Sequence, residues 1–544
     1  MADSWAAIGD KAISGRRNPV GTIEAAGAIA RATSRGPPSP PEASRDRPLD
    51  RKLTGKRGRG RQTQRYRDGK EEMSSTIPPT EPSLINLQLG WPSPRLFAAS
   101  GLLDGATRVL TSDSETAAAL IYGPHVGHPP LRKSVAEWLS SVYGPSIDYE
   151  RICITNGASG NLANVLQKFT DPLYTRRIFM VEPTYFLACP IFEDNGFRGK
   201  LRGVPEDGDE GVDIAFLRRE LEIAEKEARD VARSTGRADA PAVKVGKPYP
   251  KIYRYVVYLV PTFSNPSGKT LSVKMREELV RLAREHDALV ISDDVYDFLS
   301  WPEGPSAPDD AVADVPPRLV DVDGEMPGGS QFGNTVSNGS FSKVIGPGVR
   351  VGWAEGTPAF VQELAEVGSS SSGGAPSHLT STFVDKMLRS GNLQSHIKKV
   401  LVPTYRERYY ALMRSVEDVL VPLGVSLEAN APKDASTATA GGFFTYLLLP
   451  GDLPSAKVVA AFALREKQLR VAFGHMFTVT GDEGSLARAE AEGGFARCVR
   501  LCWAWHEVDD IKEGVTRLAA AIEDIRSLIK KGEDVSSQGS IGIR

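Results

Sequence analysis

The sequence predicts an α/β protein in which a mostly parallel sheet lies between helices, followed by a smaller α+β domain. Short β-branched runs typical of buried strands alternate with helical patterns; the clearest of these runs are residues 178–182, 256–260 and 288–294. Between the last two, Met275, Leu279 and Leu282 fall on one face of a helix. The order strand, helix, strand indicates a parallel sheet. From about Gly391 the pattern changes, which indicates the second domain.

The second domain is expected to combine helices with strands. Its elements are a long amphipathic helix, a strand, a helix, a strand and a final helix, at 396–420, 441–450, 455–467, 498–505 and from about 508. We therefore expect a large domain at 83–390, whose N-terminal segment touches the small domain, a small domain at 391–530 and a flexible tail at 531–544. Two charged stretches are expected to be surface insertions: 205–250, which is helical at its centre, and 302–333, which is acidic and loop-like.

Residues 1–82 differ in composition from the rest of the chain: they are rich in Arg, Gly, Pro and Ser and poor in apolar residues. We therefore expect a disordered basic tail. Its first 72 residues carry 16 Lys and Arg against 9 Asp and Glu. An arginine-rich run of this kind suits nucleic acid or a targeting peptide, but Asp3 and Asp10 are atypical of a mitochondrial presequence. A solvated tail is favoured. Met73 is a candidate for the natural start, a hypothesis that N-terminal peptides beginning at Ser74 would support.

Composition excludes several classes of protein. No apolar run approaches the ~20 residues that cross a bilayer, so we expect a cytoplasmic protein without a membrane partner, with mitochondrial import by the tail left open. The four cysteines are too few and too scattered for a disulfide framework, and Cys498 with Cys502 cannot complete a zinc site. We expect no metal and no nucleic-acid partner.

The segment NGSFSKVIGPGVRVGWAEG, residues 338–356, carries the most specific chemistry. Ser340 and Ser342 precede Lys343, and Arg350 follows across a Gly-Pro-Gly turn. A lysine can form an imine with a phosphorylated aldehyde, while hydroxyls and a guanidinium hold its phosphate. Taken alone, the same stretch also suits a polar loop with a surface lysine.

Three further segments place polar side chains after predicted strands. Asp293 and Tyr296 follow a strand at the edge where open parallel sheets bind ligands. A carboxylate there can keep a pyridine nitrogen protonated, although capping a helix is a common role for such an aspartate. Asn265 lies in an Asn-Pro turn after another strand, and the small-residue turn before Ser159 can offer backbone N–H groups to a phosphate. Tyr185 follows a fourth strand and could stack on a ring.

Together these segments resemble the class I/II aminotransferases of the fold type I pyridoxal phosphate family, over roughly residues 84–530. The resemblance implies an aspartate aminotransferase-like fold with a seven-stranded sheet, and pyridoxal 5′-phosphate as cofactor. It makes Lys343 the Schiff-base lysine and the acid/base, and Asp293 the partner of the pyridine nitrogen. The remaining cofactor contacts that it implies are phosphate ligands at Ala158, Ser159, Ser340, Ser342 and Arg350, phenolic-oxygen partners at Asn265 and Tyr296, and a stacking ring at Tyr185.

Two further matches extend the resemblance. IYGPHVGHPPLRKSVAEWL, residues 121–139, is similar to the family segment whose tyrosine, here Tyr122, reaches the phosphate of the neighbouring subunit, which implies a homodimer. CVRLCWAW places Arg500 where the family keeps the arginine that binds the substrate α-carboxylate, with Asn265 beside the substrate. Cys502 and Trp503 depart from the small or hydroxylated residues usual after this arginine, which puts the shape of the pocket there in question.

The sequence therefore predicts a transaminase that exchanges an amino group between an L-amino acid and a 2-oxo acid such as 2-oxoglutarate, with an aromatic or 2-aminoadipate preference suggested by the resemblance. A β- or γ-eliminating C–S lyase remains an alternative, because the same carbanion serves both reactions. A pyridoxal phosphate-sensing regulator is disfavoured, since residues 1–82 lack the apolar periodicity of a winged helix. An inactive homologue is disfavoured by the intact Lys343, Asp293 and Arg350.

Overall fold

The computed structural model describes residues 83–535 except 145, 207–210, 237–238, 303, 305–312, 314 and 428–438. The predicted basic tail at 1–82, the possible start at Met73 and most of the predicted tail at 531–544 lie outside the described residues. Within the described residues, no helix has the length and apolar character needed to cross a bilayer.

A seven-stranded sheet forms the centre of the large domain, in the order β2-β9-β8-β6-β5-β3-β4. The strands are β2 (Ile152–Thr155), β3 (Arg177–Glu182), β4 (Leu201–Pro205), β5 (Tyr255–Leu259), β6 (Ala288–Ser292), β8 (Thr335–Ser340) and β9 (Gly352–Glu355). Only β9 runs against its neighbours. The mostly parallel sheet predicted from the sequence is confirmed.

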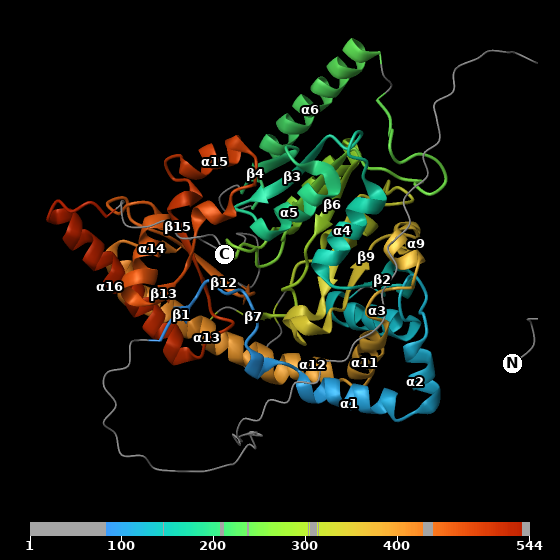
Figure 1. Ribbon diagram of the computed structural model, residues 1–544, viewed down its shortest axis with the longest axis horizontal. Helices are drawn as coiled ribbons and strands as arrows, with labels where there is room; N and C mark the ends of the chain where they lie inside the picture. The colour runs from blue at the N-terminus through green and yellow to red at the C-terminus, as the bar shows by residue number, and fades with distance from the viewer. Residues whose placement is uncertain are drawn as a thin grey trace, which may run out of the picture. The chain divides into compact units, whose positions relative to one another are not determined.

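Helices cover both faces of this sheet because its strands β3, β5 and β6 are apolar on both sides. Along β3, for example, Ile178 and Met180 belong to one buried cluster and Phe179 and Val181 to another. The first cluster is closed by α4 (Ala158–Phe169), α5 (Cys189–Phe192) and α9 (Pro358–Ala365), and the second by α6 (Ile214–Thr235), α7 (Val273–Glu285) and α8 (Leu319–Glu325). Figure 1 shows α4 and α5 packed over the strands, with α6 extending beyond the sheet.

The predicted helix between two strands is α7. The Ser272 hydroxyl accepts a hydrogen bond from the Met275 N–H at 3.1 Å and so caps its N-terminus. Met275, Leu279 and Leu282 are buried against the sheet, as the spacing predicts.

The acidic stretch 302–333 is not entirely loop-like, and that prediction is wrong for its C-terminal half. α8 lies there with Leu319 and Val322 in the core. Two of its acidic side chains are buried and paired: Asp321 with Arg318 at 2.9 Å, and Asp323 with Arg284 at 2.8 Å. Because these aspartates are buried in ion pairs, the segment forms a helix where its net charge indicated a surface loop.

The C-terminal part forms a four-stranded sheet in the order β10-β12-β15-β14, flanked by helices. Its elements are β10 (Ser426–Leu427), β12 (Phe444–Leu448), β14 (Ala472–Phe473), β15 (Cys498–Cys502), α12 (Asn392–His396), α13 (Val402–Ser415), α14 (Ala456–Lys467), α15 (Glu483–Glu490) and α16 (Val508–Lys530). Helical turns at 397–401 and 416–420 make α12 and α13 into one long run, as predicted.

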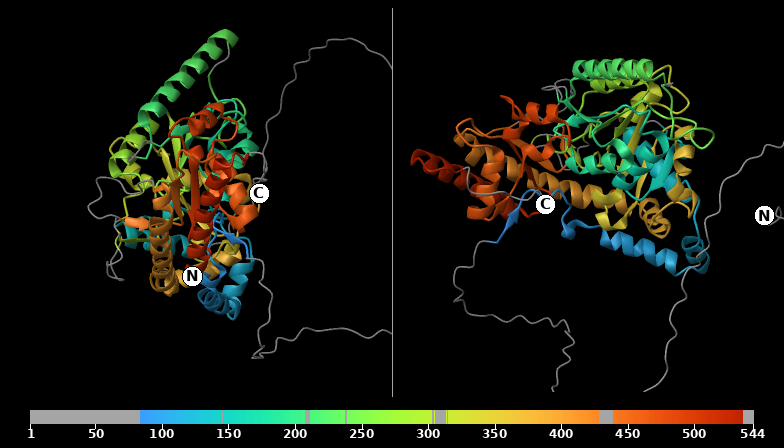
Figure 2. Two further views of the ribbon diagram at one scale, coloured as in Figure 1. Left: turned by 90° about the vertical axis from the view of Figure 1, so that its left-hand side faces the viewer. Right: turned by 45° about the horizontal axis from the view of Figure 1, so that its top comes forward.

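The N-terminal segment crosses to this small sheet region. β1 (Ile85–Asn86) pairs in parallel with β13 (Leu469–Arg470), the two strands lying side by side in Figure 1. The chain then passes into α1 (Ala99–Leu110), which runs beside α11 (His378–Arg389) in both Figure 1 and Figure 2. This crossing brings residues 86–91 over the C-terminal edge of the large sheet.

Candidate active site

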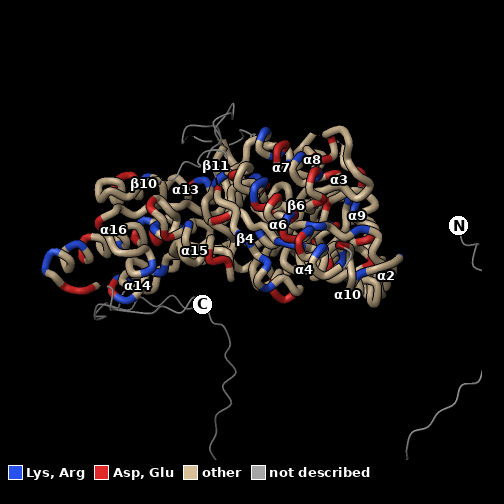
Figure 3. Tube along the Cα trace, turned by 90° about the horizontal axis from the view of Figure 1, so that it is seen from above, with Lys and Arg blue, Asp and Glu red and all other residues tan. Residues whose placement is uncertain are grey.

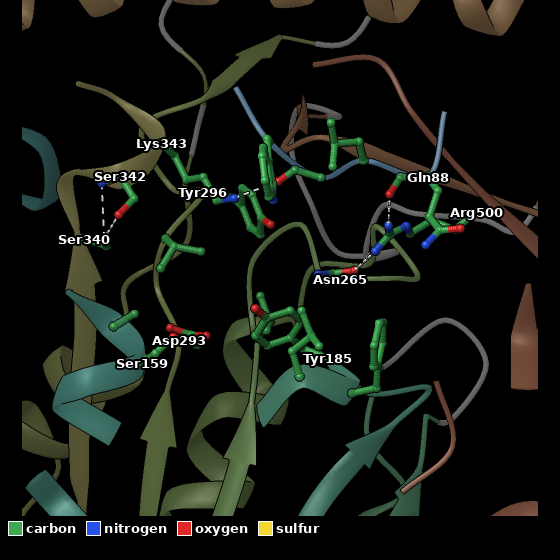
Figure 4. A pocket seen from close by; sticks show the side chains of 18 of the residues that line it. Gln88, Ser159, Tyr185, Asn265, Asp293, Tyr296, Ser340, Ser342, Lys343 and Arg500 are labelled. Atoms are coloured by element: carbon green, nitrogen blue, oxygen red, sulfur yellow. Dashed lines mark hydrogen bonds between the residues drawn. The ribbon is translucent and has the colours of Figure 1, made fainter. Parts of the chain in front are cut away.

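A cavity of about 390 Å³ lies at the carboxyl ends of β5, β6 and β8, where the N-terminal segment and the small sheet meet the large one. Eleven of the twelve site residues predicted from the sequence line it: Ala158, Ser159, Tyr185, Asn265, Asp293, Tyr296, Ser340, Ser342, Lys343, Arg350 and Arg500. The twelfth, Tyr122, follows α2 (Asp113–Leu120) and is 86% exposed, outside the cavity. Figure 4 shows most of this set converging from different elements.

One end of the cavity is built to hold an anion. α4 begins after Gly157, and no side chain caps its first N–H groups. The Arg350 guanidinium lies beside this turn and donates to the Asn156 carbonyl at 2.8 Å, while Ser342 and Ser340 share a hydrogen bond of 3.0 Å. A helix N-terminus, a guanidinium and two hydroxyls together suit a phosphate dianion.

Only glycine fits at position 157. Its φ is +94°, and a Cβ there would lie 2.7 Å from Nη2 of Arg350. The glycine therefore allows the guanidinium to approach the helix N-terminus, which is the arrangement that a phosphate needs.

Asp293, directly after β6, provides a buried carboxylate beneath the centre of the cavity. Its oxygens accept hydrogen bonds from Tyr258 at 2.8 Å and from the Asn338 amide at 3.3 Å, and Asn338 is held in turn by Asn161 at 2.9 Å. Burial raises the pKa of Asp293 to about 6, against the opposing effects of the Tyr258 hydrogen bond and the charge of Lys343. A buried carboxylate of this kind favours a cationic ring N–H beside it.

Lys343 ends a turn of 3-10 helix that follows β8. Its ammonium donates to the Gly90 carbonyl at 2.9 Å and lies 5.1 Å from the centre of the Phe443 ring and 5.7 Å from that of Tyr296. Burial lowers the pKa of Lys343 to about 8. A substantial fraction of the amine is therefore neutral near pH 7 to 8 and able to act as nucleophile or base.

Arg500, in the middle of β15, lies at the other end of the cavity from the serines (Figure 4). It donates to the Asn265 side chain at 2.6 Å and to the Gln88 carbonyl at 2.5 Å, and packs over the Phe444 ring at 4.1 Å. Among the described residues no carboxylate pairs with it, and its buried Nε has no hydrogen-bond partner. The guanidinium is therefore positioned to receive a carboxylate from a ligand.

Several residues of the cavity escaped the sequence analysis. Gly90 and Arg470 line it and depend on the crossing of the N-terminal segment. Tyr258 does not line the cavity but bonds Asp293, and a polar residue inside an apolar strand is the signal that would have identified it. Trp91 also lines the cavity, and its ring centre lies 6.2 Å from that of Trp505.

Outside the cavity lie Cys502 and Trp503, whose effect on the pocket the sequence left in question, and two histidines. Cys502 and Trp503 are buried in the core and do not line the cavity. His125 and His475 pair with Glu366 and Glu490, each at 3.1 Å, away from the cavity. Among the described residues no group of three or more His, Cys, Asp and Glu side chains is arranged to hold a metal.

Charges elsewhere are mixed. Basic and acidic residues alternate over the elements seen in Figure 3, so that view of the described chain shows no extended basic face.

Comparison with known proteins identifies the relatives of this chain. A model of the family described as aminotransferase class I and II matches residues 99–518. An uncharacterized protein of Saccharomyces cerevisiae, YER152C, is 34% identical over 460 residues, which cover 80% of this chain and 96% of that protein. Aromatic-amino-acid aminotransferase 1 of Thermococcus litoralis is 27% identical, covering 81% and 88%. The 2-aminoadipate transaminase of Thermus thermophilus is also 27% identical, covering 82% and 92%.

Solved structures agree on the fold. Kynurenine aminotransferase of Pyrococcus horikoshii, determined in complex with PMP, has a TM-score of 0.62 and 25% identity, covering 81% of this chain and 91% of that one. A mutant aspartate aminotransferase of Thermus thermophilus has a TM-score of 0.57 and 21% identity, covering 81% and 92%. The aspartate aminotransferase-like fold predicted from the sequence is confirmed.

Proposed function

The chain belongs to the family of class I and II aminotransferases, and on that premise we propose that it is a pyridoxal phosphate-dependent transaminase acting on an L-amino acid and a 2-oxo acid. The observation that carries the proposal is the shared cavity. Lys343, with its lowered pKa, lies between an anion site at the N-terminus of α4 and the unpaired guanidinium of Arg500.

The residues present fit pyridoxal phosphate. The phosphate suits Arg350, the two serines and the uncapped N–H groups of Ala158 and Ser159. When bound, this cofactor supplies an electron sink for the charge left at Cα when one of its bonds breaks. With the cofactor bound, Asp293 would keep its ring nitrogen protonated, Tyr296 and Asn265 would donate to its phenolic oxygen, and the Tyr185 ring would stack on the pyridine.

Lys343 performs the proton transfer. Its neutral amine removes the proton from the substrate Cα and returns one to C4′ of the cofactor, a role suited to a base whose pKa lies near the working pH. Arg500 binds the substrate α-carboxylate with its planar fork of donors and thereby orients Cα toward the amine. The Asn265 side chain, bonded to Arg500 at 2.6 Å, fixes that fork.

A homodimer is part of the proposal. α1, α2 and the turn after them expose large apolar side chains: Leu103, Leu110, Leu120, Ile121 and Tyr122, each at least half exposed. Several large apolar side chains exposed on neighbouring elements are typical of a subunit interface. With two copies joined there, Tyr122 of one subunit would reach the phosphate site of the other.

The substrate proposal follows the relatives. Two of them carry the names aromatic-amino-acid aminotransferase and 2-aminoadipate transaminase, and we propose an amino donor of one of these classes with 2-oxoglutarate as acceptor. The cavity supplies apolar walls through Trp91, Phe186, Leu187 and Met476.

An absorption titration tests the function. Purified protein with added pyridoxal phosphate should develop a visible band that Lys343→Ala lacks, and the band should bleach on addition of particular amino acids, with release of the matching 2-oxo acid. Release of ammonia with pyruvate or 2-oxobutanoate would favour the lyase instead. A band that no amino acid changes would favour a sensor, and the absence of a Lys343-dependent band would refute cofactor binding at this site.

A further inference from the structure

The cavity carries more positive charge than the proposed reaction uses. Its lining includes four cations, Lys343, Arg350, Arg470 and Arg500, against one carboxylate, Asp293. Lys343 is assigned to proton transfer, Arg350 to the phosphate and Arg500 to the α-carboxylate. Arg470 has no assigned role, although a cation enclosed in a cavity is costly without a partner.

Arg470 makes no ion pair within the part of the chain that the structure describes. Its Nε is buried and makes no hydrogen bond, and among the described residues no carboxylate lies within ion-pairing distance of its guanidinium. Its backbone is fixed, since Arg470 pairs with Asn86 across β13 and β1 and its carbonyl accepts from the Leu87 N–H at 2.9 Å. The side chain therefore starts from a fixed point of the backbone and is free to pair with a carboxylate of a ligand in the cavity.

Arg470 lines the same cavity as Arg500 but comes from a different strand pair. Ala472 lies directly opposite Arg500 in the β14–β15 ladder, and Arg470 comes two residues earlier in the same extended segment. The N-terminal segment passes between Arg470 and the end of β15, since the Leu87 N–H donates to the Arg470 carbonyl at 2.9 Å and the Leu87 carbonyl accepts from the Cys502 N–H at 2.8 Å.

This pair lies away from the anion site. Arg470 and Arg500 come from strands of the C-terminal part, whereas the phosphate ligands come from β8, its following turn and α4. Figure 4 shows Ser340 and Ser342 on one side of Lys343, and Arg500 with Gln88 and Asn265 on the other. Arg470 is therefore available to the substrate rather than to the cofactor phosphate.

We propose that Arg470 binds the side-chain carboxylate of a dicarboxylic substrate whose α-carboxylate is held by Arg500. The inference rests on the proposed transaminase function and narrows it: the site takes an acidic amino acid and its 2-oxo dicarboxylate. Met476 and Leu187, which line the same cavity, provide apolar contact for the methylene groups between the two carboxylates.

Steady-state kinetics of the holoenzyme test the assignment with acceptors matched in chain length. With Arg470→Met, kcat/KM for 2-oxoglutarate should fall about 10- to 100-fold, because a charge-assisted pair is lost. With 2-oxopentanoate, which lacks the second carboxylate, it should change less than about 3-fold. Arg470→Lys should retain part of the preference. Arg229→Met, which removes the same charge from an exposed position on α6, should behave as wild type in both reactions.

Binding provides a readout that does not depend on turnover. Glutarate should bind the wild-type holoenzyme more tightly than pentanoate, and Arg470→Met should abolish this difference while Arg229→Met keeps it. Equal losses for both acceptors, or an unchanged preference for glutarate in Arg470→Met, would overturn the role of Arg470. A wild-type protein that prefers glutarate through Arg470 yet transfers no amino group would refute the proposed function and leave the dicarboxylate site standing.

Discussion

Asp293 should destabilise the cofactor-free protein, so that Asp293→Asn raises stability while it lowers activity. Burial raises the pKa of this carboxyl to about 6 from its ordinary 3.8, which corresponds to about 3 kcal/mol of lost stability when it is ionised. Asparagine avoids that charge and keeps an acceptor for Tyr258. A weaker bond with Asn338 costs about 1 kcal/mol, so we expect a net gain of about 2 kcal/mol at pH 7.

The stability difference between wild type and Asp293→Asn should depend on pH. The folded protein holds the Asp293 proton more tightly than the unfolded chain does, so the wild-type free energy of unfolding should fall as pH rises from about 4 to about 6. The advantage of Asp293→Asn should therefore be present at pH 7 and shrink toward pH 4.

Urea unfolding of cofactor-free protein at several pH values measures this difference, with the exposed Asp230→Asn on α6 as control. Added pyridoxal phosphate should stabilise wild type more than Asp293→Asn, because the ring nitrogen needs the carboxylate. A variant no more stable than wild type at pH 7, or an advantage that persists undiminished at low pH, would refute the reasoning.

Two further outcomes are expected from the anion site and the lysine. Gly157→Ala should weaken pyridoxal phosphate binding by about 10-fold or more, because its Cβ would lie 2.7 Å from Nη2 of Arg350 and the backbone φ at this position is strained for alanine. A fluorescence titration measures the affinity, and an unchanged value would contradict the role given to the turn. The rate of cofactor capture by cofactor-free protein should rise with pH through about 8, because burial lowers the pKa of Lys343 to that value and only the neutral amine attacks; stopped-flow absorbance measures the profile, and a midpoint near 10 would show that the amine is solvated.

Site residues close behind a strand were the most predictable from the sequence. Asn265, Asp293 and Lys343 each come soon after the end of a parallel strand, and such ends meet at one edge of the sheet. Their convergence in one cavity therefore needed only the correct strand assignment. The parallel sheet, α7 and the order of elements after Gly391 were predictable for the same reason, since periodicity and burial agree there.

Contacts that cross between distant parts of the chain were not predictable. Gly90 and Arg470 reach the cavity because β1 pairs with β13, two-residue strands too short to leave a pattern in the sequence. Likewise α8 was mistaken for loop, because its acidic residues look solvated until Arg318 is known to be buried among them. In both cases tertiary partners decide the outcome, and local propensity does not.

The crossing of the N-terminal segment also determines when, during synthesis of the chain, the cavity can be completed. The hydrogen bond between Arg500 and the Gln88 carbonyl joins residues 412 positions apart, and that between Lys343 and the Gly90 carbonyl joins residues 253 apart. The ribosome makes the chain from its N-terminus, so residues 86 and 88–91, which line the cavity, are synthesised long before β15 is available to contact them. A nascent chain that ends before β15 lacks Arg500 and therefore cannot have both Arg470 and Arg500 in the cavity. Binding of a dicarboxylic acid there would mark a molecule whose synthesis has passed β15.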